Sequence, residues 1–109
     1  SSTQFIANKP AFKDAWKRKK MEQVVLLLRG ALAANNMVGL KLNIEEKNLR
    51  SALERLPALK NPTIAPLARE GWVAVESVIE ESVVREIIPA LKDAGAQGII
   101  EYSLNKLIL

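Results

Sequence analysis

Hydrophobic residues recur every three or four positions along residues 9–34, the spacing of a helix with an apolar face. Pro10 suits the first turn of such a helix, and Asn35 with Asn36 suits a left-handed exit from its last turn. Four consecutive basic residues at positions 17–20 interrupt the apolar face. The pattern predicts one long helix, with a connector as its first half and a packed second half.

A period-two alternation, typical of half-buried strands, follows the helix. It runs through residues 38–44 and again through residues 72–79, and an apolar segment at residues 98–102 predicts a last strand. Three prolines in residues 57–66 predict a structured loop, which leads into at most a short edge strand around residues 63–67.

A helix is predicted after each of the two alternating strands. Pairs of glutamates at positions 45–46 and 80–81 stand at the helix starts, where negative charge is favourable. Pro57 closes the first helix, and Gly95 is a natural stop for the second, which Pro89 should kink or tighten. The apolar stripes of the two helices are Leu49, Ala52, Leu53 and Leu56, and Val83, Val84, Ile87, Ile88 and Leu91.

The two strand-helix units repeat at a spacing of 35 residues. Residues 44–46 and 79–81 share the sequence Ile-Glu-Glu, and the apolar positions of the following helices coincide. Two such units, each followed by a further strand, give the order βαββαβ. This order predicts an α+β ferredoxin-like sandwich, with two helices on one face of a four-stranded antiparallel sheet. Chance similarity between two amphipathic units is the alternative.

Composition limits the chemistry that the chain can perform. Its 109 residues, 49% of them hydrophobic, suit a single globular core. The absence of cysteine and histidine excludes disulfides, thiolate and imidazole metal ligands, and every mechanism that needs these side chains. An oxygen-only metal site or a carboxylate pair stays possible in principle. The composition therefore favours a binding or regulatory module over an enzyme.

The net charge of +4 is concentrated near the N-terminus, because residues 1–29 carry +5 and residues 30–109 carry −1. A basic arm can bind nucleic acid, and the ferredoxin-like order also occurs in RNA-recognition domains. Those domains need stacking aromatic residues on the central strands, where only Trp72 is available. A solvated helix face is the favoured interpretation of the basic run, and a nucleic-acid-binding module is the alternative.

No membrane span is predicted, because the richest apolar stretch, residues 24–34, is too short and is interrupted by Arg29. No secretory signal is predicted, because residues 1–10 lack the apolar run and the small-residue cleavage pattern of one. A cytoplasmic location is the default expectation. Thr63, next to Pro62, could present its hydroxyl to a small polar ligand or could cap a turn locally. The glutamate pairs are explained by their positions at helix starts rather than by catalysis or metal binding.

A resemblance to a known family lies in residues 56–67, which read Leu-Pro-Ala-Leu-Lys-Asn-Pro-Thr-Ile-Ala-Pro-Leu, and in residues 71–76, which read Gly-Trp-Val-Ala-Val-Glu. These segments closely resemble the C-terminal regulatory domain of long-form ATP phosphoribosyltransferases. The resemblance covers residues 21–109 as the regulatory domain. Residues 1–20 are similar to the last strand of the enzyme's catalytic part and the connector after it. The chain is therefore expected to be the tail of a longer polypeptide.

Enzymes of this family join ATP to phosphoribosyl pyrophosphate at the first committed step of histidine biosynthesis, require magnesium and are inhibited by histidine. Their C-terminal domain is a ferredoxin-like module, similar to PII proteins, that binds L-histidine between neighbouring subunits of a hexamer. The resemblance thus implies an allosteric domain for feedback inhibition, with the catalytic domains of the same polypeptide as partners. It implies no catalytic residue, metal site or cofactor in this chain, and no nucleic-acid or membrane partner.

The resemblance also implies the position of the histidine site. By position, the site falls on Asn43, Leu59, Thr63, Val78 and Gly98. Thr63 fits the family's motif best, and Asn43 cannot supply a charge to the ligand.

Overall fold

The computed structural model of the protein describes residues 4–57 and 61–109. Its contacts divide the chain into two units. The connector unit holds the helices α1 (Lys9–Lys13) and α2 (Ala15–Ala34) and the tail Asn105–Leu109, and the sheet unit is Asn36–Leu104. The long helix predicted before the sheet is present as α2.

The predicted helix of residues 9–34 is interrupted at Asp14, which corrects the expectation of one continuous helix. Asp14 has extended backbone angles (φ −77°, ψ 119°), and its side chain accepts a hydrogen bond of 3.0 Å from the amide of Lys17. Aspartate favours this N-cap position because its carboxylate satisfies an amide that has no partner within the helix. Asn8 caps α1 in the same way, and Pro10 lies in the first turn of α1 as predicted.

The exit from α2 also differs from the prediction of a left-handed residue. Asn35 has right-handed helical angles (φ −59°, ψ −35°), and its amide donates to the carbonyl of Leu32 at 3.1 Å. Among the described residues, a positive φ occurs only at Gly71, Gly95 and Gly98. The left-handed conformation is energetically unfavourable for a residue that has a Cβ. The turn after α2 forms without any residue in that conformation.

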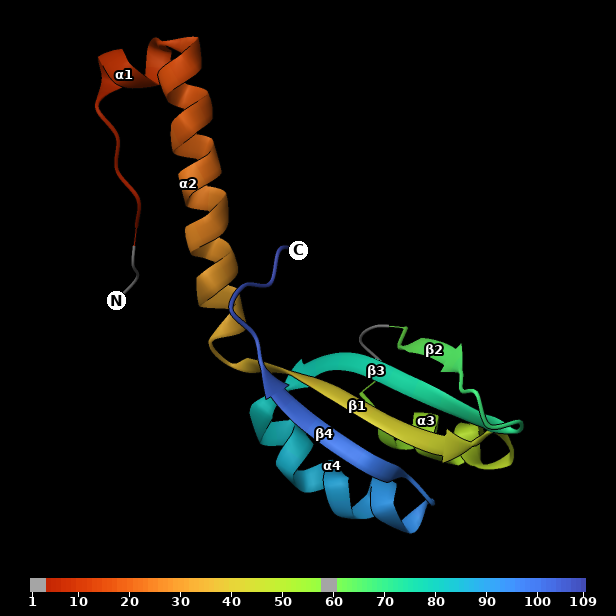
Figure 1. The fold of residues 1–109 in the computed structure, drawn as a ribbon. Helices are drawn as coiled ribbons and strands as arrows, with labels where there is room; N and C mark the ends of the chain where they lie inside the picture. The colour runs from red at the N-terminus through yellow and green to blue at the C-terminus, as the bar shows by residue number, and fades with distance from the viewer. Residues whose placement is uncertain (1–3, 58–60) are drawn as a thin grey trace. The chain divides into compact units, whose positions relative to one another are not determined.

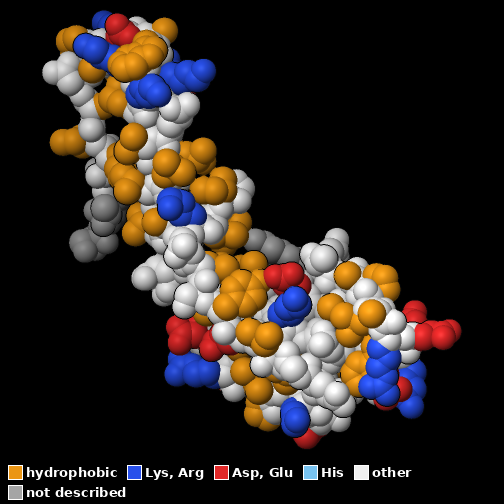
Figure 2. Space-filling view, viewed as in Figure 1, with side chains coloured by type: hydrophobic (Ala, Val, Ile, Leu, Met, Phe, Trp, Pro, Cys, Tyr) orange, Lys and Arg blue, Asp and Glu red, His pale blue; other side chains and the backbone are white. Residues whose placement is uncertain are grey.

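The second half of α2 is exposed within the connector unit, contrary to the prediction that it is packed. Gly30 and Ala34 are its buried residues, while Leu26 and Leu32 are 51% and 59% exposed. Figure 2 shows hydrophobic side chains spread along this helix. Within this unit, only α1, residues 4–8 and the short tail are available to cover α2. Much of the surface of α2 therefore stays exposed.

The tail packs on α2 at Gly30. The amide of Leu107 donates to the carbonyl of Gly30 at 2.9 Å. A Cβ at Gly30 would lie 3.4 Å from the carbonyl oxygen of Leu107 and 2.5 Å from the end of the exposed Ile108 side chain, so glycine allows the tail to pack here without a shift of that side chain.

The sheet unit has the predicted ferredoxin-like architecture. Its elements are β1 (Met37–Glu45), the 3-10 turn η1 (Glu46–Asn48), α3 (Leu49–Arg55), β2 (Thr63–Pro66), β3 (Trp72–Glu80), α4 (Glu81–Asp93) and β4 (Gln97–Ser103). The four strands pair antiparallel in the order β2-β3-β1-β4. Both helices lie on one face of the sheet (Figure 1). The other face, called the helix-free face below, carries the candidate site.

The 35-residue repeat is visible as an internal symmetry of this sheet. Val38 and Val73 are equivalent in the repeat, as are Ile44 and Ile79. In the sheet, Val38 lies opposite Ile79 and Ile44 lies opposite Val73. The two equivalent strands therefore pair about a pseudo-two-fold axis, as two copies of one strand-helix unit would. The most buried large side chains of the shared core are Leu40, Leu42, Ile44, Val75, Val84 and Leu91.

The helix α4 begins and ends where the sequence predicts. Its first residue, Glu81, places a carboxylate in the first turn, and the amide of Glu81 donates to the carbonyl of Asn36 at 3.0 Å. At the other end, Gly95 has a φ of 102°, and the amide of Ala96 returns to the carbonyl of Leu91 at 3.0 Å. The helix continues on both sides of Pro89, which lies at an exposed position.

Candidate functional site

The helix-free face is defined by the alternation of side chains along the strands. On β3, Val73, Val75 and Ile79 point into the core between sheet and helices, so Glu76 and Val78 point to the opposite side. Residues opposite each other in an antiparallel pair share a face. The register therefore extends this face to every strand of the sheet.

Thr63 and Val78 lie close together on the helix-free face. Thr63, the first residue of β2, is exposed and lies opposite Glu76 of β3. Val78 follows Glu76 by two residues, so its side chain stands beside it on the same face, where it is half-buried. Leu59, which was predicted for the same site, lies outside the described residues.

Asn43 and Gly98 form a second group. Asn43 is half-buried on β1, and a Cβ at Gly98 would lie 3.7 Å from its Nδ2 atom. Gly98 has a φ of 57°, which favours glycine, and it lies where the pairing of β1 with β4 shifts register after Lys41. The structure thus gathers the four described candidates at one sheet, in two groups.

A tyrosine-glutamate bond crosses this face. The hydroxyl of Tyr102, on β4, donates to the carboxylate of Glu76, on β3. This hydrogen bond, together with burial and the negative charge of Glu76, raises the pKa of Tyr102 above its usual value of 10.0. The hydrogen bond and the negative charge of Glu76 thus favour the protonated hydroxyl, which is the form that donates.

The bond depends on Gly39 of β1, the strand between β3 and β4. Gly39 lies opposite both Tyr102 and Val78, and the tyrosine ring covers it so closely that a Cβ would overlap the ring. Glycine is needed here for its lack of a side chain, since its φ is not positive.

Lys41 completes a row of side chains across the helix-free face of the sheet. It lies opposite Glu76 on one side and opposite Ile100 on the other. The row therefore runs Thr63, Glu76, Lys41, Ile100, and it offers a hydroxyl, a carboxylate, an ammonium group and an apolar surface. Such a surface can bind a small molecule that carries both charges. Within residues 4–57 and 61–109, no cluster of three or more acidic side chains could hold a metal ion.

Glu76 and Tyr102 were not singled out from the sequence. The alternation of residues 72–79 carried the information that Glu76 faces away from the core. The bond to Tyr102 could not be found in this way, because it depends on the register of β1 with both of its neighbours.

Two residues of the basic run contact side chains of α1 and α2 within the connector unit. Arg18 forms an ion pair of 3.1 Å with Glu22, and its guanidinium carbon lies 4.5 Å from the centre of the Phe12 ring. The ammonium group of Lys20 lies 5.8 Å from the centre of the Trp16 ring. All four residues of the run are exposed, which supports the interpretation of the run as a solvated helix face.

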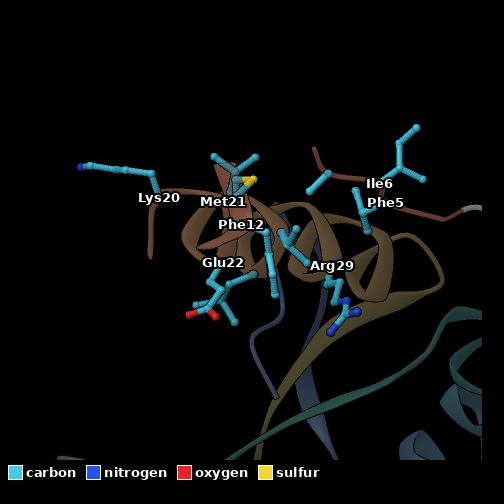
Figure 3. A pocket seen from close by; sticks show the side chains of 11 residues that line it. Phe5, Ile6, Phe12, Lys20, Met21, Glu22 and Arg29 are labelled. Atoms are coloured by element: carbon cyan, nitrogen blue, oxygen red, sulfur yellow. The ribbon is translucent and has the colours of Figure 1, made fainter. Parts of the chain in front are cut away.

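A groove of about 710 Å³ lies in the same unit, between α2 and the residues before α1. Phe5, Ile6, Phe12 and Met21 give it a largely apolar lining, and Arg29 stands at its side (Figure 3). No helix within the described part of the chain is both long enough and apolar enough to cross a membrane.

The comparison of the chain with known families settles its class. Residues 34–106 match the family described as HisG, C-terminal domain. The chain belongs to this family. The match includes the whole sheet unit and leaves α1 and most of α2 outside, so the HisG C-terminal domain is the ferredoxin-like unit that carries the helix-free face.

Curated relatives of this HisG C-terminal domain protein are identical to the chain at about half of its positions. The ATP phosphoribosyltransferase of Nitratidesulfovibrio vulgaris (strain Miyazaki F) is 54% identical over 99% of this chain and 37% of its own length. Those of Solibacter usitatus and Thermodesulfovibrio yellowstonii are 51% and 52% identical over 100% and 99% of this chain. The chain spans 37–38% of the length of these three relatives.

Proposed function

We propose that the chain is the C-terminal regulatory part of an ATP phosphoribosyltransferase and that its sheet unit binds L-histidine for feedback inhibition of histidine biosynthesis. The observation that carries the proposal is the family match over the entire sheet unit. The name shared by relatives that are at least 51% identical supports the assignment to this enzyme. Since ATP is a cytoplasmic substrate, we expect the polypeptide to work in the cytoplasm.

The proposed histidine site consists of Asn43, Leu59, Thr63, Val78 and Gly98. The position of the four described residues on or beside one open sheet face supports this set. A hydroxyl such as that of Thr63 can meet either the ammonium group or the carboxylate of an amino acid, because it both donates and accepts hydrogen bonds.

Inhibition requires a coupling free energy between this site and the catalytic part. Histidine must bind one arrangement of the regulatory domains better than another, and the connector must transmit that preference. The exposed apolar surface of α2 supports a role in which the catalytic domains of the same polypeptide cover it. Contacts among sheet units would contribute to a hexamer. Magnesium, which the family resemblance implies for the whole enzyme, would serve the catalytic part.

The proposal is tested with the Thr63→Val variant of the complete polypeptide. Valine keeps the shape of threonine and removes the hydroxyl, so we expect the histidine concentration for half inhibition to rise roughly 5- to 150-fold, from a loss of about 1–3 kcal/mol. Turnover without histidine should not change. Ile64→Val, on the same strand but the opposite face, is the matched control. Unaltered inhibition of Thr63→Val would remove this residue from the site.

A further inference from the structure

The carboxylate of Glu76 lies at the centre of the helix-free face, although the family resemblance gives it no role. It stands directly opposite Thr63 on one side and Lys41 on the other, and two residues from Val78 along β3. The side chain is exposed, so a ligand that contacts Thr63 can reach it.

The position of this carboxylate is fixed from a distant strand. The ring of Tyr102 crosses β1 over Gly39, and its hydroxyl donates to Oε1 of Glu76. Long exposed side chains ordinarily lose conformational entropy when a ligand orders them, at a cost of ~0.5–1.5 kcal/mol each. The tyrosine removes part of that cost before the ligand arrives.

The bond also leaves the carboxylate able to bind a cation. A carboxylate has about four acceptor positions on its two oxygens, and one hydroxyl occupies one of them. Hydrogen bonds between an ammonium group and a carboxylate are roughly twice as strong as neutral ones. In histidine, the α-ammonium group carries a full charge at neutral pH, whereas the imidazole, with a pKa of about 6.5, is mostly neutral.

We propose that Glu76 is an additional residue of the effector site, that it accepts a hydrogen bond from the α-ammonium group of the bound amino acid, and that Tyr102 is its positioning residue. This inference rests on the proposed function. According to this inference, Glu76 makes the site bind an amino acid more tightly than the corresponding acid that lacks the amino group. Lys41, beside Glu76, provides the complementary charge for the carboxylate of the effector.

The test is a calorimetric titration of the complete polypeptide with two ligands, L-histidine and 3-(imidazol-4-yl)propionate, which lacks the amino group. For Glu76→Gln we expect histidine affinity to fall roughly 10- to 150-fold, the range for a hydrogen bond to a charged group. Affinity for the deaminated ligand should stay the same. Glu80→Gln is the matched control, because Glu80 is an exposed glutamate on the same strand and face.

Tyr102→Phe provides the second variant, since it keeps the ring over Gly39 and removes only the hydroxyl. We expect a several-fold loss for histidine and none for the deaminated ligand. Equal losses for both ligands in Glu76→Gln would overturn the assignment to the ammonium group. Wild-type histidine affinity in Glu76→Gln, with weakened binding in Thr63→Val, would exclude Glu76 and leave the proposed function intact. Failure of the wild type to bind histidine would refute the proposed function itself.

Discussion

The sheet unit buries large hydrophobic side chains in a core, whereas the connector unit leaves most of its large hydrophobic side chains exposed. In the sheet unit, Val84 and Leu91 of α4 are fully buried against the strands. In the connector unit, α2 is longer than α4, yet its buried residues are the small Gly30 and Ala34. The sheet unit therefore contains its own core, whereas most of the large apolar side chains of α2 are exposed within the connector unit.

The arrangement of apolar positions explains this difference. The stripe of α4 repeats every three or four residues, so a single sheet covers it. In α2, Leu26, Leu27 and Leu28 are consecutive, which places leucines at steps of ~100° around the helix. All three are exposed in this unit. Apolar side chains that point in several directions cannot all be covered by one short segment, so they stay exposed within the connector unit.

The largest expected effect separates the two units by stability. Leu91→Ala should lower the free energy of unfolding of the chain by about 2–5 kcal/mol, because it opens a cavity in the core of the sheet unit. Leu26→Ala, its counterpart in α2, should change it by less than about 0.5 kcal/mol, as surface substitutions usually do. Urea denaturation of both variants measures the difference. A comparable cost for Leu26→Ala would show that α2 is packed within the chain.

A second prediction compares a close glycine contact in each unit. Gly39→Ala should cost about 1–3 kcal/mol, because its Cβ overlaps the ring of Tyr102 and forces a shift in a packed face. Gly30→Ala should leave the unfolding of the sheet unit almost unchanged, because its Cβ would meet only the end of the exposed Ile108 side chain, which can turn away within the connector unit.

Thermal unfolding of the two glycine variants checks this difference. In a Tyr102→Ala background, Gly39→Ala should lose most of its cost, since the two residues then no longer conflict. A full cost in that background would mean that the ring over Gly39 is not the cause.

The smallest effect is a change in the titration of Tyr102. It is the one tyrosine of the chain, so the ultraviolet absorbance of tyrosinate reports it alone. Glu76→Gln should lower the pKa of Tyr102 toward 10.0, because it removes the main cause of the increase. The raised pKa stabilises the folded wild type below pH ~10, and this contribution is lost as the pH rises through the folded pKa. An identical titration curve in both proteins would argue against the bond.

The sequence predicts the sheet unit far better than the connector unit. The 35-residue repeat and the period-two strands determine the topology, because local patterns and the pairing of equivalent strands agree there. The break at Asp14 was missed, since a capping aspartate competes with an apolar periodicity that continues across it. The exposure of α2 was missed because periodicity reports an apolar face without saying what covers it.

The residues of the candidate site came from the family resemblance, and their role in binding histidine stays a prediction. Thr63 and Gly98 could be named from the family motif, and the structure places them at the sheet face that the topology leaves open. The contact of Tyr102 with Glu76 could not be predicted, because these residues are 26 positions apart and meet only across β1.

Calorimetric titration of the complete polypeptide with L-histidine tests the central claim most directly, with an amino acid that has an aliphatic side chain as the control ligand. We expect saturable binding with one histidine per sheet unit, no binding of the control ligand, and weaker binding in the Thr63→Val variant. The absence of histidine binding to a folded and catalytically active polypeptide would contradict the assignment of the sheet unit as its feedback-regulatory domain.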